Sequence, residues 1–277
     1  MTLYRGMDRA ALDAAYNNGA AVADSARFIA LWEQRSAALR AAEPRYLDLR
    51  YGEAERERID FFPIAAARPA PTLLFIHGGY WQSRAKEIFS FLAAGPRSLG
   101  INIALIGYTL APEARLDTIV AQCRRGLHWL HARLSELSGD PERLYLSGWS
   151  AGGHLTAMLM DEEIVRGALA ISGIYDLEPI RLCYLNEKLR LDAEEARRNS
   201  PLFHLPARAP RLFVTVGGAE LPELVRQSET YYEAWRERGL PGEFVPLPGR
   251  DHFTALEELA TPEGILTKAL GRLVFAA

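Results

Sequence analysis

The segment Gly148-Trp149-Ser150-Ala151-Gly152 carries the residues of this chain best suited to covalent chemistry. It follows an apolar run, Arg143 to Ser147, and precedes a helix-prone run, His154 to Met160. A G-x-S-x-G sequence between a strand and a helix is typical of a nucleophile elbow, whose glycines permit a tight turn that exposes the serine hydroxyl. We therefore expect Ser150 to be the nucleophile of an acyl-transfer reaction.

A serine hydroxyl is a weak nucleophile unless a base removes its proton and an acid orients that base. The partners of an elbow serine follow it along the chain in the order acid, then base. His252 lies in a loop just after the last predicted strand, from where it can fold back over the strand ends. His204 lies at the Pro-flanked end of a polar segment. We predict His252 as the base and His204 as a structural or peripheral residue.

The acid should follow the strand predicted over 212–216. Glu220 lies in the loop directly after that strand, and a glutamate serves as well as an aspartate if the loop accommodates one extra methylene. Glu223 on the next helical turn and Asp176 after the preceding strand are alternatives. We favour Glu220, and all three carboxylates could instead be solvated surface groups.

A glycine-rich loop, His77-Gly78-Gly79-Tyr80-Trp81, directly follows the buried strand predicted over 72–76. Glycines let the backbone approach a substrate closely and aim its amides at the oxyanion of a tetrahedral intermediate. The residue after the nucleophile supplies another such amide. We expect His77 to brace the loop. The predicted oxyanion donors are Gly78, Gly79, Tyr80 and Ala151.

Alternating strands and helices should position these residues. Apolar runs predict strands over 58–62, 72–76, 101–106, 143–147, 167–171, 211–216 and 243–247, and helical periodicity predicts helices over 116–137, 221–238 and 255–275. This alternation indicates an α/β fold with a mostly parallel central sheet and helices on both faces. We expect a single domain over 1–277, with N-terminal helices over 1–45, broken near Asn17-Asn18-Gly19, and a small cap inserted over 177–206.

Several motifs resemble one known family. The stretch 77–81 resembles the HGGxW motif of the kynurenine formamidase (arylformamidase) branch of α/β hydrolases, which is related to hormone-sensitive-lipase-like esterases. The stretch 148–154 is similar to its elbow, and Glu220 to Glu223, running on to Ser228, is similar to its acid loop, where aspartate is usual. The likeness spans Tyr51 to the C-terminus, and the N-terminal helices also fit.

The resemblance implies an α/β-hydrolase fold and a cofactor-free serine hydrolase. Its substrates would be small carboxylic esters or aryl formamides such as N-formylkynurenine. A general short-chain carboxylesterase without a formamidase role is the alternative enzyme. A non-catalytic α/β-hydrolase-fold binding protein is a further alternative, although the chain has candidates for every catalytic group.

Aromatic residues adjoin the catalytic segments and suit a flat aryl or small acyl substrate, unless they are buried as core. The substrate contacts that we predict are Trp81, Trp149, Tyr175 and Phe253. The carboxylate of N-formylkynurenine would also need a cation or a hydrogen-bond donor. The candidates are Arg84, Arg181 and Arg250.

The composition narrows the function classes further. The net charge of −3 gives no electrostatic reason to expect nucleic acid or an anionic membrane as a partner, and no apolar run reaches the length of about 18 residues that spans a membrane. We expect a small-molecule substrate as the partner, and the sequence leaves a homodimer open.

Metal ligands, a disulfide framework and a signal peptide are all missing from the sequence pattern. Cys123 and Cys183 fit no metal spacing, and no carboxylate or cysteine completes a ligand set with His128 and His131. The segment Met1 to Ala10 lacks the apolar core of a signal peptide. We therefore expect no metal and no cofactor, and a reduced cytoplasm as the location.

Overall fold

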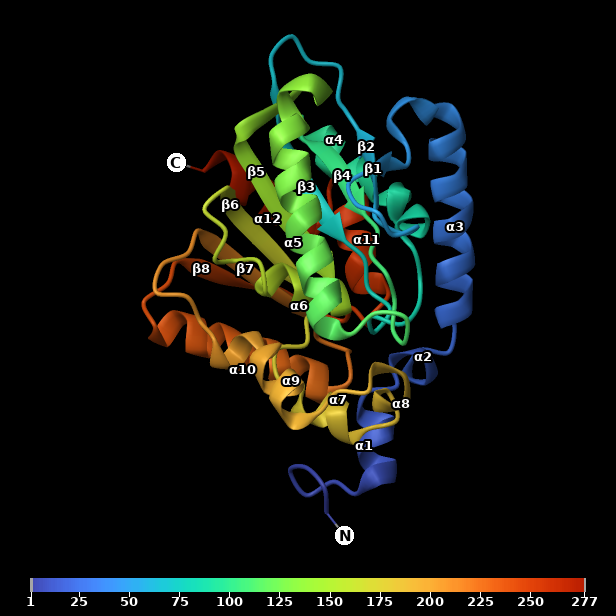
Figure 1. Cartoon of the computed structure of the whole chain (residues 1–277), viewed down its shortest axis with the longest axis vertical. Coiled ribbons are helices and arrows are strands. Elements are labelled where there is room, and N and C mark those ends of the chain that lie inside the picture. The colour runs from blue at the N-terminus through green and yellow to red at the C-terminus, as the bar shows by residue number, and fades with distance from the viewer. Residues whose placement is uncertain (1, 277) are drawn as a thin grey trace.

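One eight-stranded sheet organises the computed structural model of the chain, which describes residues 2–276 (Figure 1). The strands are β1 (Leu49–Arg50), β2 (Arg58–Phe62), β3 (Ala70–Ile76), β4 (Asn102–Ile106), β5 (Gly139–Trp149), β6 (Val165–Ile171), β7 (Arg211–Gly217) and β8 (Gly242–Leu247). Their order is β1-β2-β4-β3-β5-β6-β7-β8, and every neighbouring pair from β4 to β8 is parallel. Strand β2 runs antiparallel to both of its neighbours, β1 and β4.

The central strands are apolar on both faces because helices cover both sides of the sheet. All residues of β3 are buried, and alternate side chains enter different apolar clusters. Leu74 and Ile76 pack on one face, and Leu73 and Phe75 pack on the other. This period of two is the direct consequence of strand geometry, and double burial explains the continuous apolar runs in the sequence.

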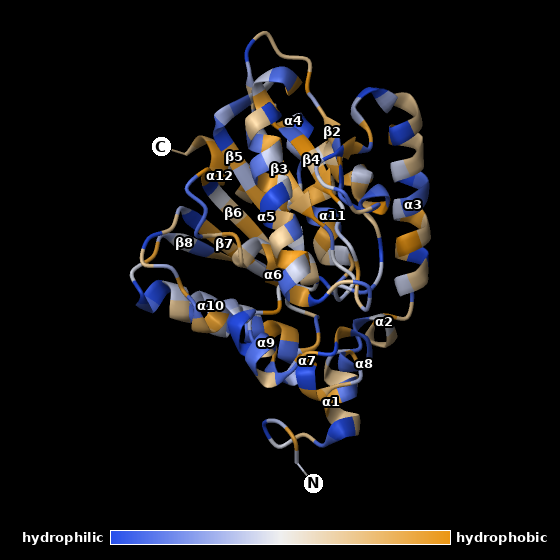
Figure 2. Cartoon of the chain, in the orientation of Figure 1, coloured by the Kyte–Doolittle hydropathy of each residue, from blue (hydrophilic) through white to orange (hydrophobic). Residues whose placement is uncertain are grey.

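Two layers of helices enclose the sheet. The helices on the face of Leu74 are α5 (Leu116–Arg133), α6 (Ala151–Ala157) and α10 (Pro222–Glu237). The helical segments on the opposite face are α3 (Ser25–Ala42), η2 (Lys86–Ala93), α4 (Ala94–Ser98), α11 (Thr254–Ala260) and α12 (Ile265–Phe275). In Figure 1, α5 crosses in front of the sheet, and α11 and α12 lie behind it. Figure 2 shows apolar strands at the centre and hydrophilic residues along the outer sides of the helices.

Short helices from two distant parts of the chain meet beyond the carboxyl ends of the strands. The N-terminal part contributes α1 (Arg9–Ala15) and α2 (Asn18–Ala21). The predicted cap segment over 177–206 contains α7 (Glu178–Leu182), α8 (Asn186–Leu189), α9 (Ala193–Arg198) and η4 (Pro201–Phe203). The Tyr184 amide donates to Asp13 Oδ1 at 2.7 Å, which ties the cap segment to α1. The division into one domain with a cap stays a prediction.

The predicted α/β architecture is confirmed, with a mostly parallel sheet between helices. One predicted helix is wrong: the segment 255–275 forms α11 and α12, separated at residues 261–264. Pro262 lacks an amide donor and its ring clashes with a preceding carbonyl, so a continuous helix is unfavourable there. The helix predicted over 116–137 ends at Arg133 and continues as the 3₁₀ helix η3 (Leu134–Leu137). The predictions missed β1, η1 (Pro44–Tyr46), η2 and α4.

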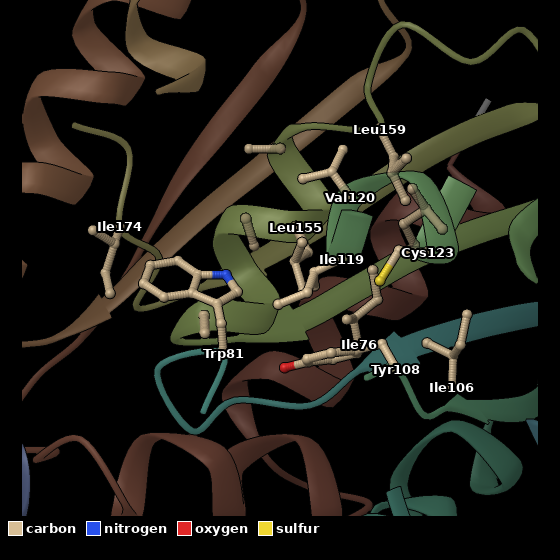
Figure 3. Close-up of a cluster of buried hydrophobic side chains, with 14 of the residues drawn as sticks. Ile76, Trp81, Ile106, Tyr108, Ile119, Val120, Cys123, Leu155, Leu159 and Ile174 are labelled. Atoms are coloured by element: carbon tan, nitrogen blue, oxygen red, sulfur yellow. The ribbon is translucent and has the colours of Figure 1, made fainter. Parts of the chain in front are cut away.

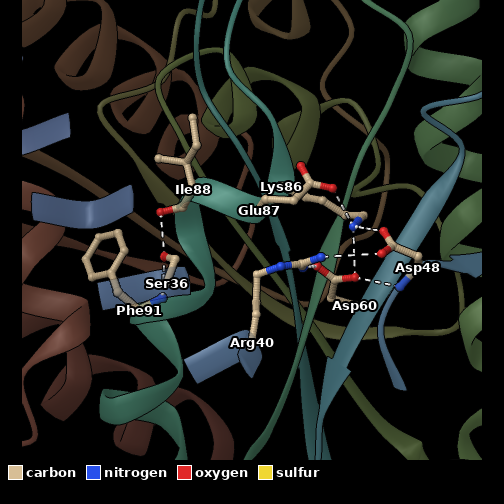
Figure 4. Close-up of polar contacts among 8 residues, drawn as sticks. All are labelled: Ser36, Arg40, Asp48, Asp60, Lys86, Glu87, Ile88 and Phe91. Carbon is tan, nitrogen blue, oxygen red and sulfur yellow. Dashed lines mark hydrogen bonds and ion pairs between the residues drawn. The ribbon is translucent and has the colours of Figure 1, made fainter. Parts of the chain in front are cut away.

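An ion cluster around the buried side chains of Lys86 and Asp60 fastens α3 to the sheet near β2 (Figure 4). The Lys86 ammonium donates to Asp48 at 2.6 Å, to Asp60 at 2.8 Å and to Glu87 at 2.7 Å. Arg40 of α3 also pairs with Asp60, whose side chain is fully buried. The three carboxylates lie close enough to one another to hold a metal ion, but the Lys86 ammonium donates to all three. We therefore assign this cluster a structural role.

None of the helices in residues 2–276 combines the length and the apolar composition that crossing a membrane requires.

Trp32 on α3 has the largest apolar side chain in the helical layer on the Leu73 face of the sheet. Its replacement tests the packing of this layer. Its side chain is fully buried, with ring centroids 5.2 Å from Phe91 and 5.6 Å from Trp149. We expect Trp32→Ala to lower the free energy of unfolding by about 3–5 kcal/mol in urea titrations, because it leaves a large cavity. Leu31→Ala on the same helix, at a side chain that is 43% exposed, should change it by less than about 0.5 kcal/mol. Equal losses in the two variants would contradict this packing.

Candidate active site

The predicted nucleophile lies at the sharp turn from β5 to α6. Ser150 has φ 59° and ψ −118°, a conformation that costs a non-glycine residue free energy and is found at functional turns. The turn is possible because Gly148 packs against the chain: a Cβ there would lie 2.2 Å from the Gly152 carbonyl oxygen. The Ser150 amide donates to the Ile171 carbonyl at 2.8 Å, which fixes the turn to β6. The structure thus forms the predicted elbow.

The predicted base lies in the loop after β8 and is bound to the residue before the nucleophile. Trp149 Nε1 donates to the His252 carbonyl at 2.9 Å, and the two rings lie 4.7 Å apart between centroids. This contact holds the His252 loop over the elbow. Within residues 2–276, no hydrogen bond joins Ser150 Oγ to His252 Nε2. Catalytic hydrogen bonds are often long without substrate and tighten when substrate binds.

The carboxylate of Glu220 contacts this histidine directly. His252 Nδ1 lies 2.6 Å from Glu220 Oε2, and the Glu220 side chain has no exposed surface. Because a carboxylate oxygen accepts, Nδ1 carries the hydrogen, and Nε2 is left to accept a proton. Glu220 Oε1 accepts from Ser172 Oγ at 2.5 Å and from the Gly217 amide at 2.7 Å. The acid is therefore held by donors on both oxygens.

Backbone hydrogen bonds join the acid loop to the base loop. The Gly218 amide donates to the Leu247 carbonyl at 2.9 Å, and the Ala219 amide donates to the Arg250 carbonyl at 3.0 Å. The two loops leave β7 and β8, which are adjacent parallel strands. This pairing fixes the separation of Glu220 from His252 independently of their side chains.

The alternative acids have other partners. Glu223 accepts from Tyr16 at 3.1 Å and pairs with Arg226 at 2.7 Å, and Asp176 accepts from the Tyr4 hydroxyl at 3.0 Å. The structure brings Glu220 to His252 and directs Glu223 and Asp176 elsewhere. The assignment of catalytic roles stays a prediction.

The glycine-rich loop lies against the elbow, as an oxyanion site requires. A Cβ on Gly78 would lie 2.7 Å from the Trp149 carbonyl oxygen and 3.1 Å from Ser150 Cβ, so only glycine fits there. Among the described residues, none accepts a hydrogen bond from the Gly78 or Gly79 amide. The Ala151 amide is the first of α6 and has no partner within the helix. These three amides can hold an oxyanion.

Tyr80 ties this loop to the N-terminal helices. Its hydroxyl donates to the Tyr16 carbonyl at 2.7 Å and accepts from Asn18 Nδ2 at 3.0 Å. Burial raises the pKa of Tyr80 well above its ordinary value, so the hydroxyl stays a donor. Its side chain is therefore occupied, and only its backbone amide could serve the predicted oxyanion role.

The His77 side chain supports the glycine-rich loop. Its Nδ1 lies 2.8 Å from the Gly78 carbonyl oxygen, and its ring stacks on Tyr108 with centroids 4.3 Å apart. Burial lowers the pKa of His77 to about 4, so the ring is neutral near pH 7. These contacts fit the bracing role that the sequence predicts.

The four aromatic residues predicted to contact substrate are all buried. Trp81 and Tyr175 have no exposed surface, and Trp149 and Phe253 are 3% and 4% exposed. Figure 3 shows the Trp81 indole within the apolar cluster that includes Leu155 and Ile174. In this structure these side chains pack the walls around the site, and their contact with substrate stays a prediction.

The sequence did not single out two polar residues near the site, His154 and Ser172. Trp81 Nε1 donates to His154 Nδ1 at 3.1 Å, and His154 Nε2 lies 2.7 Å from the Asn199 carbonyl oxygen in the cap segment. Ser172 contacts the acid. The position of Ser172 directly after a predicted strand was the available signal, because such positions meet at one sheet edge.

The candidate cations differ in their partners. Arg181 pairs with Glu178 at 2.7 Å, and Arg250 pairs with Glu258 at 2.6 Å. Arg84 forms no ion pair with a carboxylate in residues 2–276, and its role as a substrate contact stays a prediction. His128, discussed above as a possible metal ligand, lies 2.7 Å from Glu162 on the surface of the protein.

Comparisons with known proteins agree with this geometry. The sequence model of a family described as the alpha/beta hydrolase fold matches residues 73–256. Kynurenine formamidase from Danio rerio is 37% identical over 242 residues, which cover 82% of this chain and 81% of the relative. Kynurenine formamidase from Salmo salar is 35% identical over 243 residues, with the same coverage.

A solved structure extends the likeness to nearly the whole chain. A crystallised candidate thioesterase from Silicibacter sp. TM1040 has a TM-score of 0.84 and 33% identity, and the alignment covers 96% of this chain and 99% of the other. The resemblance to the kynurenine formamidase branch that the sequence motifs indicate is confirmed. This chain belongs to the α/β-hydrolase fold family.

Proposed function

We propose that this chain is a serine hydrolase that cleaves aryl formamides similar to N-formylkynurenine, or small carboxylic esters, through an acyl-enzyme on Ser150. The observation that carries the proposal is the 2.6 Å contact between Glu220 and His252, held over a strained serine turn by the Trp149 bond to the His252 carbonyl. A nucleophile, a base and a buried acid in this arrangement have a common use in acyl transfer.

The chemistry follows from the positions of the groups. Ser150 Oγ attacks the carbonyl carbon while His252 Nε2 takes its proton, and the negative charge forms on the carbonyl oxygen. Amides of Gly78, Gly79 and Ala151 would stabilise this oxyanion, and each such donor is worth about 10²–10³ in kcat. The imidazolium then protonates the leaving amine or alcohol. A water, deprotonated by His252, attacks the acyl-serine and releases formate or another carboxylic acid.

The formamide preference rests on the relatives. The proteins named kynurenine formamidase from Danio rerio and Salmo salar share 37% and 35% identity with this chain over four fifths of its length. A general short-chain carboxylesterase is the second candidate, because the same groups cleave activated esters. A purely binding role is disfavoured, since a strained serine turn beside a histidine held by a buried carboxylate would have no use in it.

The proposed location is the cytoplasm, and the proposed partner is a small molecule. Cys123 and Cys183 are both buried and free among the described residues, which suits a reducing compartment. The net charge of −3 favours neither nucleic acid nor an anionic membrane.

Removal of the nucleophile should abolish activity. We expect Ser150→Ala to lower kcat for p-nitrophenyl acetate by about 10⁴-fold or more, as loss of a triad nucleophile does. The variant should also lose labelling by a fluorophosphonate probe, and its far-ultraviolet circular dichroism should match that of the wild type. Unchanged turnover in a folded Ser150→Ala variant would exclude this mechanism.

The acid assignment predicts an order of effects for two neighbouring glutamates. Glu220→Gln should lower kcat by about 10³–10⁴-fold, because the amide can leave the imidazole in the wrong tautomer. Glu223→Gln should lower kcat by less than about tenfold, because Glu223 pairs with Arg226 rather than His252. Steady-state kinetics of both variants measure this, and the reverse order would move the acid role to Glu223.

Substrate preference separates the two enzyme candidates. If the chain is a formamidase, kcat/KM for N-formylkynurenine should exceed that for p-nitrophenyl acetate, and Ser150→Ala should abolish both activities. Formation of kynurenine is followed by its absorbance. Ester turnover without any kynurenine formation would instead favour the general carboxylesterase.

A further inference from the structure

Ser172 is a buried serine directly after β6, and it is not one of the nucleophile, acid, base or oxyanion residues assigned above. Its hydroxyl donates to Glu220 Oε1 at 2.5 Å. We propose that Ser172 is a positioning residue for the acid, whose hydroxyl fixes the Glu220 carboxylate so that Oε2 faces the His252 imidazole. This inference rests on the proposed function, because it gives Glu220 the role of the acid.

The backbone at Ser172 indicates that the hydroxyl has a use. Ser172 has φ 51°, in the left-handed region that glycine and asparagine occupy at less cost than serine. A serine there carries unfavourable backbone energy that a glycine would avoid. Strained residues of this kind are concentrated at functional sites, where their surroundings maintain them. The hydrogen bond to Glu220 is an interaction that a glycine could not supply.

The glutamate needs this donor because its side chain is long. A glutamate has one more rotatable bond than an aspartate, so more rotamers must be excluded to aim one carboxylate oxygen at Nδ1. Ser172 and the Gly217 amide hold Oε1 from two directions, which leaves Oε2 to His252. Since the Glu220 side chain has no exposed surface, bulk water cannot replace a lost donor.

The end of β6 also links the other parts of the site. The Ile171 carbonyl accepts from the Ser150 amide at 2.8 Å, and the Ser172 amide donates to the Thr215 carbonyl of β7 at 2.8 Å. Strand β6 lies between β5, which carries the nucleophile, and β7, which precedes the acid. The hydroxyl of Ser172 therefore positions the Glu220 carboxylate relative to the same strand end that fixes the nucleophile turn.

Two substitutions remove the hydroxyl with opposite effects on the backbone. Ser172→Ala keeps the Cβ and its strain, whereas Ser172→Gly relieves the strain at φ 51°. We expect both to lower kcat by about 10- to 100-fold, the usual range for losing one hydrogen bond to a buried charge, with KM changed less than about threefold. Thermal unfolding of both variants shows that they fold.

Ser147→Ala is the matched control. Ser147 is a fully buried serine on neighbouring β5, and its hydroxyl donates to the Leu169 carbonyl at 2.8 Å, away from Glu220. Its replacement removes a comparable buried hydrogen bond. We expect it to keep kcat within about threefold of the wild type.

A double-mutant cycle distinguishes positioning from general packing. If Ser172 acts through the carboxylate, Ser172→Ala should cost less than about threefold in kcat when Glu220 is already glutamine. An equal loss in the wild-type and Glu220→Gln backgrounds would overturn the positioning role, and so would wild-type kcat in both Ser172 variants.

Failure of the underlying function has its own signature. A wild-type protein that neither hydrolyses p-nitrophenyl acetate nor reacts with a fluorophosphonate would remove the serine-hydrolase function, and the Ser172 role with it. An active, labelled wild type with fully active Ser172 variants would overturn the Ser172 role alone.

Discussion

The hydrogen bond between His252 Nδ1 and Glu220 Oε2 depends on a carboxylate that the protein has removed entirely from water. A buried carboxylate is costly unless donors satisfy both oxygens. Ser172 and Gly217 supply donors to Oε1 from the ends of two neighbouring strands, and His252 supplies the donor to Oε2. The acid can therefore be buried only if the sheet brings these strand ends together. The order of the strands is consequently a condition for the chemistry of the site.

The parallel part of the sheet meets this constraint by extending its hydrogen bonding past the strand ends. The Ser150 amide bonds to the Ile171 carbonyl, the Ser172 amide to Thr215, and the Gly218 amide to Leu247. Each bond joins residues at the carboxyl ends of adjacent strands from β5 to β8. The nucleophile, acid and base loops are thus positioned by backbone, which is more rigid than side chains. Groups held in this way need little rearrangement during reaction.

Local sequence patterns predicted many of the strands and the turn that carries Ser150. The apolar run over 58–62 coincides with β2, and the glycines around Ser150 indicated the elbow because their turn needs small residues. The break between α11 and α12 was missed because helical periodicity on both sides outweighed Pro262. The position of Ser172 after a predicted strand places it at the correct sheet edge, but the sequence does not show its 2.5 Å contact with a residue 48 positions away. The burial of Trp81 likewise depends on α6 and the cap segment, which local patterns do not place.

The loop that supplies the oxyanion amides depends on a histidine that stays neutral. Trp81 Nε1 donates to His154 Nδ1, so the ring proton must lie on Nε2, which donates to the Asn199 carbonyl. A protonated ring would carry hydrogens on both nitrogens and could not accept from Trp81. Burial lowers the pKa of His154 to about 4, which keeps the acceptor available near pH 7. The oxyanion loop, α6 and the cap segment are therefore joined through one neutral imidazole.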